Sequence, residues 1–219
     1  MRVDMHVHTW YSLDSMNSPS RLLKAMDEKG IDAIAVTDHK KTYAWRDFPK
    51  DRTIRGIEFS TDRGHVLGYF LEEDFRQRGI MTFYEALDFV RENDGIIVIA
   101  HPFDFHKSFE GLDDIINDVD GIEVCNGKVK MDKYNRKAYN IAKEYGKIMT
   151  AGSDAHFPWQ VGLAYLEANV GDLEEFREHL EKGKTRVVCN RQPVYLTVAL
   201  GALAAIQARF GIFGRPSSR

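Results

Sequence analysis

The sequence is short of cysteine and of net charge, and each shortage excludes a class of protein. Its two cysteines, Cys125 and Cys189, match no metal-binding or redox spacing. We therefore expect both to be packing residues, which suits a reducing compartment. Lysine and arginine number 30 against 33 aspartate and glutamate residues, for a formal net charge of −3. That balance argues against a broad basic surface for nucleic acid, so any recognition of phosphate must be local.

Uninterrupted apolar segments are also scarce. The first ten residues, MRVDMHVHTW, are too polar for a signal peptide, which favours a cytoplasmic protein. The most apolar run is 194–213, but Gln207 and Arg209 interrupt it and Gly201 and Gly211 dilute it. We expect this C-terminal segment to be a helix that packs against the rest of the chain or against a second subunit of a homo-oligomer, and not a membrane span.

What the sequence does contain is a regular alternation of short β-rich runs with longer helical patterns. With 43% hydrophobic and 29% charged residues, 219 residues suffice for one domain over residues 1–219. Helices are expected over 18–30, 82–95 and 132–146, each with a serine, threonine or aspartate start and a glycine stop. The expected strands are 3–7, 33–37, 54–60, 65–71, 96–100, 121–125 and 148–152, with 163–168 and 186–189 as weaker candidates.

This order predicts an α/β fold made of repeated βα units. The runs 54–60 and 65–71 differ, because the four residues TDRG between them favour a hairpin that interrupts the repeat. No internal repeat or linker marks a domain boundary.

Histidines and carboxylates gather at the ends of the expected strands. His6 and His8 are two residues apart on a strand, so both side chains project from one face and can bind one ion. In a barrel of βα units the carboxyl ends of the strands converge on the face where active sites are built. A single histidine beside a strand is more often structural than a ligand. Six histidines together with several carboxylates argue against a purely structural role, because burying them together without a metal would cost desolvation and charge-repulsion energy. The cluster comprises His6, His8, His39, His65, His101 and His156 with Asp14, Asp38, Glu58 and Asp154.

Imidazole and carboxylate without cysteine suit zinc, manganese or iron better than calcium or magnesium. We therefore expect two to three divalent transition-metal ions as cofactors. Asp38 precedes His39 directly. It can orient that imidazole as a hydrogen-bond acceptor or simply end the strand.

Six segments resemble, in order, the motifs of the polymerase and histidinol phosphatase (PHP) family. They are HVHTWYSLDS, VTDHK, GIEFS, GHVLGYF, IAHPF and SDAH, and they carry the metal motifs between residues 6 and 156. The resemblance implies a distorted (β/α)7 TIM-like barrel and three metal sites. By position, the first would use His6, His8, Glu58 and Asp154; the second would share Glu58 with His65 and His101; the third would use Asp14, His39 and His156. The step from His8 to Asp14 is six residues, where many relatives have five.

The resemblance and the cluster together predict a metal-dependent phosphoesterase that hydrolyses a small phosphate monoester, such as a nucleotide, with metal-activated water. Glu58 and Asp154 would hold the metals, and His156 is a candidate to protonate the leaving group. Two alternatives remain open. One is an exonuclease that trims short oligonucleotides, against which the acidic balance counts. The other is a non-enzymatic metal-binding or polymerase-associated module, against which the complete ligand set counts.

Substrate phosphates usually require cations besides the metals. Lys128 and Lys130 follow the strand 121–125, and Arg63 lies in the hairpin loop. We expect these three to bind substrate, and we favour Lys40 and Lys41 less. Most lysines in loops are merely solvated.

Overall fold

The computed structural model describes residues 1–104 and 108–190, together with residues 199, 202–203, 205–206 and 209. Most of the apolar segment 194–213, for which we expect a helix, therefore lies outside the described residues. Among the residues that the structure describes, no helix is long and apolar enough to cross a membrane.

All nine expected strands are present and form one sheet in the order β7-β6-β5-β4-β3-β2-β1-β8-β9. Strands β1, β2 and β3 are parallel to one another, as are β5, β6 and β7, while β4 runs antiparallel to both of its neighbours. The strands are β1 (Arg2–Val7), β2 (Ala33–Val36), β3 (Thr53–Thr61), β4 (Gly64–Tyr69), β5 (Ile96–Ile99), β6 (Gly121–Asn126), β7 (Ile148–Gly152), β8 (Ala164–Glu167) and β9 (Arg186–Cys189).

The sheet closes into a distorted barrel because β1 meets β7 at its carboxyl end. Val7 forms a parallel bridge with Ala155, and the His8 amide donates to the Ala155 carbonyl at 3.0 Å. At its other end β1 pairs instead with β8, through Arg2 and Val3. Seven strands thus enclose the barrel, while β8 and β9 branch away from the β1 edge. This confirms the barrel that the sequence predicts and accounts for its distortion.

Helices flank the sheet, and three of them lie within the ranges 18–30, 82–95 and 132–146 that the sequence predicts. They are α1 (Pro19–Lys29), α2 (Phe83–Glu92), α3 (Leu112–Ile115), α4 (Asp132–Glu144) and α5 (Leu173–Glu181). Ser18 caps α1, Gly30 ends it in a left-handed conformation, and Thr82 with Glu85 forms a capping box on α2. Short 3-10 turns lie at Tyr43–Asp47, Lys50–Arg52 and Pro158–Gln160.

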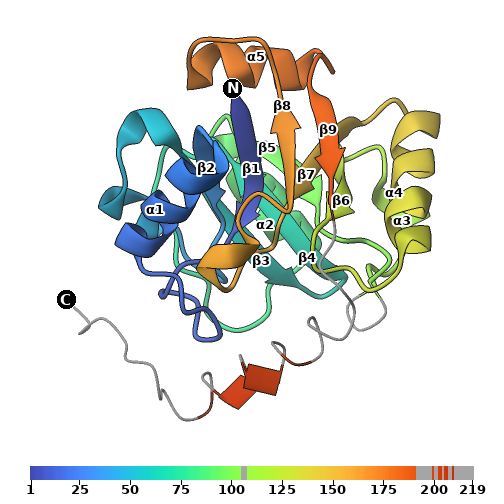
Figure 1. Ribbon diagram of the computed structural model, residues 1–219. Coiled ribbons are helices and arrows are strands. Elements are labelled where there is room, and N and C mark those ends of the chain that lie inside the picture. The colour runs from blue at the N-terminus through green and yellow to red at the C-terminus, as the bar shows by residue number, and fades with distance from the viewer. Residues whose placement is uncertain (105–107, 191–198, 200–201, 204, 207–208, 210–219) are drawn as a thin grey trace.

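Helix α5 covers the end of the barrel where the strands begin, next to the N-terminus (Figure 1). Its Phe176 and Leu180 are fully buried with Val3 and Met5 of β1. One end of the barrel is therefore sealed by apolar packing. The loops that follow β1, β2, β5 and β7 emerge at the opposite end, which leaves that end for polar groups.

The two cysteines are not separate packing residues, so that prediction is wrong. Cys125 of β6 and Cys189 of β9 form a disulfide, with their Cα atoms 5.8 Å apart. The sequence hid this pairing because 64 residues separate the two positions, and proximity arises only where β9 passes β6. Since disulfides are rare in reducing compartments, the cysteines give no support to a cytoplasmic location.

Candidate metal centre

The six predicted histidines converge at the carboxyl end of the barrel. His6 lies on β1 and His65 on β4, while His8, His39, His101 and His156 follow β1, β2, β5 and β7. Neighbouring rings lie 4.3 to 6.0 Å apart between centroids. The three predicted carboxylates, Asp14, Glu58 and Asp154, lie among them. The structure thus brings together all nine residues in the sequence-based ligand set.

Glu58 of β3 lies at the centre of the cluster and is almost fully buried. Its Oε1 is 2.6 Å from His65 Nδ1 and 3.2 Å from His101 Nε2. Its Oε2 is 2.7 Å from His39 Nδ1 and 3.4 Å from His8 Nε2. Burial alone would raise the pKa of this carboxyl group, but His65 and His39 outweigh burial and hold the pKa well below its usual range. Glu58 is therefore an ionised carboxylate with histidines on both oxygens.

Asp154 supplies a second buried carboxylate beside the first histidine pair. The Nε2 atoms of His6 and His8 are 3.1 Å apart, and Asp154 Oδ1 lies 3.3 Å from His8 Nε2. Asp154 has a left-handed backbone with φ of 52°, as does His101 with φ of 27°. Non-glycine residues in this region are strained, and such strain collects at functional sites.

Asp14 joins the cluster from the loop after β1. Its Oδ2 lies 3.1 Å from His156 Nε2 and 3.6 Å from His39 Nε2. The extra residue in the step from His8 to Asp14 therefore does not keep the carboxylate away from the two histidines that it is expected to join.

The nitrogen and oxygen donor atoms of the cluster are close enough together to bind divalent metal ions, and some of them lack a hydrogen-bond partner within the protein. Three overlapping groups each place their ligand atoms within 4.8 Å: His6, His8 and Glu58; Glu58, His65 and His101; and His8, His39 and His156. Among the described residues, Asp14 Oδ1 and His101 Nδ1 are buried without a hydrogen-bond partner, and Glu58 Oε2 has only ion-pair contacts that lack hydrogen-bond geometry. Buried polar atoms normally have partners, and a bound cation would supply them for the two carboxylate oxygens.

Glu123 of β6 is a supporting residue that the sequence analysis missed. Its Oε1 lies 2.9 Å from His6 Nδ1, and its Oε2 accepts hydrogen bonds from the His101 amide and the Asn126 side chain. A carboxylate can only accept, so Nδ1 of His6 carries a hydrogen. Burial alone would lower the pKa of His6, but Glu123 and Asp154 hold that pKa well above its usual value, so without metal the ring is protonated on both nitrogens and Nε2 can donate to His8 Nε2, 3.1 Å away. The available signal was the alternation of GIEVC, which places the glutamate on the inner face with Gly121 and Cys125.

Asp38 orients His8 indirectly and does not contact the His39 ring as a hydrogen-bond acceptor. Its two oxygens accept from the amides and the hydroxyls of Thr9 and Ser12. Because the Ser12 hydroxyl gives its one hydrogen to Asp38, it can only accept from His8 Nδ1, which is 3.2 Å away. This leaves Nε2 of His8 with a lone pair directed at Glu58 and Asp154.

The charge states of the histidines differ with their surroundings. Burial, together with His156 and His39, holds the pKa of His8 well below its usual value, so this ring is neutral. Burial would also lower the pKa of His39, but Glu58 and Asp14 outweigh it and raise the pKa to about 9. Without metal, His39 is therefore protonated at neutral pH, and a cation bound there must displace that proton.

The close approach of β1 and β7 at this end requires a glycine at position 152. A Cβ atom on Gly152 would lie 2.2 Å from the His6 Cβ and 2.5 Å from the His6 amide nitrogen. Such distances do not occur between real atoms, so any side chain here would push His6 away.

The predicted phosphate-binding cations lie in different places. Lys128 is next to the cluster, with its Nζ 3.1 Å from Asp154 Oδ1 and 3.2 Å from His156 Nδ1. Lys130 lies two residues further along the same loop and is half-buried. Arg63 is directed at the segment after β5, where its Nη1 lies 3.7 Å from Asp114 Oδ2.

A cleft of about 610 Å³ opens beside the cluster. Three candidate ligands, Asp14, His39 and His65, line one part of it. Lys40, Lys41 and Arg76 also line the cleft. The sequence favours Lys40 and Lys41 less than Lys128, Lys130 and Arg63 as substrate-binding residues, and it gives no signal for Arg76.

The chain is similar to a known protein family and to individual known proteins. Residues 132–185 match a family model described as PHP-associated. An uncharacterized protein of Methanocaldococcus jannaschii is 35% identical over 182 residues, which cover 80% of this chain and 73% of the relative.

Two solved structures share the fold at lower identity. One is a two-domain protein of Bacteroides vulgatus that contains a predicted PHP-like metal-dependent phosphoesterase, with a TM-score of 0.67, 21% identity and coverage of 87% of this chain. The other is Endonuclease Q bound to a DNA duplex with an abasic lesion, with a TM-score of 0.66, 19% identity and coverage of 84% of this chain. This chain spans 65% and 57% of their respective lengths.

Proposed function

This chain belongs to the polymerase and histidinol phosphatase (PHP) family, and on that premise we propose that it is a metal-dependent hydrolase of small phosphate monoesters. The observation that carries the proposal is the position of Glu58, a buried carboxylate with histidine nitrogens against both oxygens. This is the arrangement expected of a carboxylate that bridges two cations. The structural similarity to the Bacteroides vulgatus protein, which contains a predicted PHP-like metal-dependent phosphoesterase, supports the same chemistry.

The ligand sets follow the three clusters. His6, His8, Glu58 and Asp154 would hold one ion; Glu58, His65 and His101 a second; and Asp14, His39 and His156 a third. Zinc, manganese or iron suits these nitrogen and oxygen donors. When bound, such ions lower the pKa of water and neutralise the charge of a phosphate group.

The residues of the chain prepare this site in two ways. Glu123 and Ser12 hold Nδ1 of His6 and of His8 as hydrogen-bond donors, so that Nε2 of each ring is the atom that would bind a cation; at His6 the cation would displace the Nε2 proton. Lys128 holds a positive charge beside Asp154, where it would contact a phosphate oxygen of the bound substrate. Burial would lower the pKa of Lys128, but Asp154 and Asp14 raise it, so the side chain remains charged.

His156 is better suited to binding than to proton transfer. Its Nδ1 is 3.0 Å from the Asp154 carbonyl oxygen and its Nε2 is 3.1 Å from Asp14 Oδ2. Since both ring nitrogens are engaged, we propose that His156 acts as a ligand and that Glu58 and Asp154 serve catalysis by holding the cations. The proton for the leaving group then comes from water.

Hydrolysis assays on metal-loaded protein test the proposal. We expect release of inorganic phosphate from 4-nitrophenyl phosphate, and loss of that activity together with lower metal content in Glu58→Gln. The matched control is Glu144→Gln, because Glu144 is exposed at the end of α4. Full activity of Glu58→Gln with manganese or zinc present would refute the bridging role.

The same assays separate the alternatives. An exonuclease would cleave bis(4-nitrophenyl) phosphate and short oligonucleotides, and its affinity would fall steeply with salt. A nucleic-acid substrate has a precedent on this fold, because Endonuclease Q binds a DNA duplex. A metal-binding module would retain metal but hydrolyse none of these substrates.

A further inference from the structure

Asn126, the last residue of β6, contacts two carboxylates of the metal centre at once. Its Nδ2 is 3.1 Å from Glu123 Oε2 and 3.3 Å from Asp154 Oδ2. Its Oδ1 accepts a hydrogen bond from the Lys128 amide at 2.9 Å, and a main-chain amide can only donate. The two hydrogens on Nδ2 are therefore left for the two carboxylates, one for each. Asn126 is almost fully buried, so these bonds form in the low-dielectric interior, where they are strong.

The bond to Asp154 decides which of its oxygens faces the candidate metal ligands. Oδ2 accepts from Asn126, while Oδ1 lies 3.3 Å from His8 Nε2 and 3.1 Å from Lys128 Nζ. A carboxylate group is planar, so a partner on one oxygen also fixes the direction of the other. Asn126 thus holds Oδ1 of Asp154 on the side of the histidines.

An irregularity in β6 makes the contact with both carboxylates possible. The pairing of β6 with β7 shifts register between Glu123 and Cys125, where β6 contains one extra residue. In a regular strand, residues three apart such as Glu123 and Asn126 would project from opposite faces. The bulge brings both side chains to the metal centre, and bulges often redirect side chains in this way beside active sites.

The main chain of Asn126 is held by the side chain of Asn135, a buried residue of α4. Asn135 Oδ1 accepts from the Asn126 amide at 3.3 Å, and Asn135 Nδ2 donates to the Asn126 carbonyl at 3.2 Å. The same Nδ2 lies 3.8 Å from the sulfur atoms of both Cys125 and Cys189. One amide side chain therefore joins the disulfide to the residue that supports Asp154.

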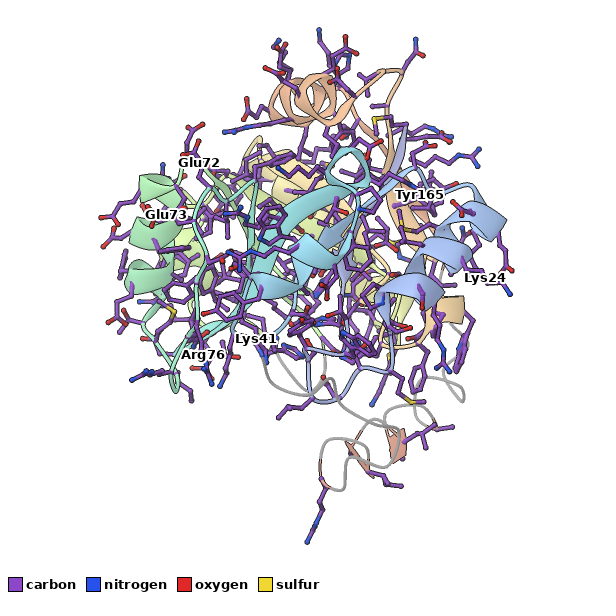
Figure 2. The ribbon with its side chains drawn as sticks, turned by 90° about the vertical axis from the view of Figure 1, so that its left-hand side faces the viewer. Lys24, Lys41, Glu72, Glu73, Arg76 and Tyr165 are labelled. Atoms are coloured by element: carbon purple, nitrogen blue, oxygen red, sulfur yellow. A yellow bond between two sulfur atoms is a disulfide. The ribbon has the colours of Figure 1, made fainter. Side chains whose placement is uncertain are left out.

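The disulfide connects this network to a strand outside the barrel. Strand β9 pairs with β8, where Val188 lies opposite Tyr165, the residue of β8 that Figure 2 labels. The cross-link ties β9 to Cys125, one residue before Asn126. Cys189 is exposed whereas Cys125 is buried, so a thiol from solvent can reach the bond through Cys189.

We propose that Asn126 is a positioning residue for Asp154 and that the disulfide holds Asn126 in place through Asn135. The inference rests on the metal centre of the proposed function, because it concerns how tightly that centre binds its ions. Two free thiols cannot approach as closely as two bonded sulfur atoms. Reduction would therefore force Cys125 and Cys189 apart and disturb their contact with Asn135. Asp154 would then lose its fixed orientation, and the metal affinity would fall.

Reduction by a dithiol is the reaction that releases this support. A thiolate of the dithiol attacks Cys189 Sγ, the S–S bond breaks, and Cys125 leaves as a thiolate that takes a proton from solvent. The second thiol of the reductant then displaces Cys189 as a thiolate, which is protonated as well. The protein gains two electrons and two protons, and the dithiol becomes a cyclic disulfide.

Titration with cobalt(II), followed by visible absorption, measures both the affinity and the coordination geometry of the bound ions. In Asn126→Ala we expect an affinity about tenfold lower for one equivalent of cobalt, with altered d–d absorption bands, because Asp154 belongs to one of the candidate sites. A general loss of stability would weaken all bound ions alike. Asn135→Ala should act in the same direction. Its matched control is Asn140→Ala, because Asn140 is an exposed asparagine of the same helix, and this variant should titrate like the unmodified protein.

The contribution of the disulfide is measured in Cys189→Ser and in the unmodified protein after reduction with dithiothreitol. The dithiol is removed in the absence of oxygen before cobalt is added, because thiols bind transition metals. Both treatments should lower the same affinity by about threefold or more, and dithiothreitol should have no further effect on Cys189→Ser. In the background of Asn126→Ala, Cys189→Ser should cause no further loss, because its route to Asp154 is already broken.

Each outcome decides the inference. Unchanged cobalt affinity and absorption in Asn126→Ala would refute the positioning role. Equal affinities of the oxidised and reduced unmodified protein would refute the role of the disulfide even if Asn126→Ala does not fold, since this comparison alters no other side chain. Additive losses in the double variant would also refute it, because the disulfide would then act by another route. Unmodified protein that binds no cobalt would refute the metal centre and the proposed function with it. Circular dichroism confirms that each variant is folded.

Discussion

Replacement of Gly152 by alanine is the sharpest test of how the barrel positions its ligands. Gly152 ends β7, where that strand comes closest to β1. The new Cβ would lie 2.2 Å from the His6 Cβ, whereas ordinary contacts at such positions begin at 3.4 Å. Relief of the clash therefore requires β1 and β7 to move apart by about 1.2 Å (3.4 − 2.2). The atoms involved belong to the backbone and to the Cβ of His6, a buried candidate ligand, so no flexible side chain can absorb the movement.

The size of the effect follows from that displacement. Overpacking of a dense interior costs about 1–3 kcal/mol, which for a chain of this length lowers the melting temperature by roughly 2–12 °C. Metal sites tolerate shifts of only about 0.2 Å in ligand distance. A movement of His6 relative to Asp154 should therefore weaken metal binding by at least about tenfold, and hydrolysis should fall by about a hundredfold.

Thermal unfolding, metal analysis and the 4-nitrophenyl phosphate assay measure the three effects on the same preparation. Gly171→Ala is the matched control, because a Cβ at Gly171 meets only a Glu175 carboxylate oxygen at 3.7 Å. We expect that variant to stay within about 0.5 kcal/mol of the unmodified protein. A Gly152→Ala protein with unchanged melting temperature and full metal content would refute the close contact between β1 and β7.

Two further predictions concern the groups around the metal ligands. Glu123→Gln should lower metal affinity by about 10–100-fold, because an amide no longer fixes the His6 tautomer; calorimetric titration measures this, and an unchanged affinity would contradict the supporting role. Since the pKa of His39 is raised to about 9 without metal, apparent metal affinity should rise by up to about tenfold per pH unit from pH 7 to 9, with proton release. The corresponding stability of the metal-free protein is complete below about pH 6.5 and is lost as pH rises through about 9. In His39→Asn the pH dependence of metal affinity should be weaker but not absent, because the pKa of His6 is also raised well above its usual value. An unchanged pH dependence in His39→Asn, or pH independence in the unmodified protein, would count against proton displacement at His39.

Local patterns in the sequence were sufficient for the strands and for the candidate ligands. Alternation along each strand decides which side chains face inward, and the convergence of strand ends follows from any barrel of βα units. The spacing of His6 and His8 and the position of Glu58 on its strand could therefore be interpreted without coordinates. Their contacts of 3.1 Å between the two imidazoles and 3.4 Å from His8 to Glu58 agree with that interpretation.

The substrate side of the site depended on long-range contacts that no local pattern contains. Lys128 contacts Asp154 across 26 residues, while Arg63 turns toward Asp114 and Arg76 lies in the cleft. The direction of a long cationic side chain in a loop depends on what lies nearby in space, and the sequence analysis had no information on that. The positions of Arg63 and Arg76 relative to the cleft therefore could not be predicted from local patterns.

The sequence by itself thus predicted the strands along the chain from periodicities of a few residues, and its resemblance to the PHP family supplied the set of candidate metal ligands. Only the tertiary structure decided which groups support those ligands and where the chain is cross-linked. Glu123 meets His6 across 117 residues, and Cys125 meets Cys189 across 64. Such pairs form where the barrel closes and β9 returns beside β6, and their separation along the chain carries no trace of that approach.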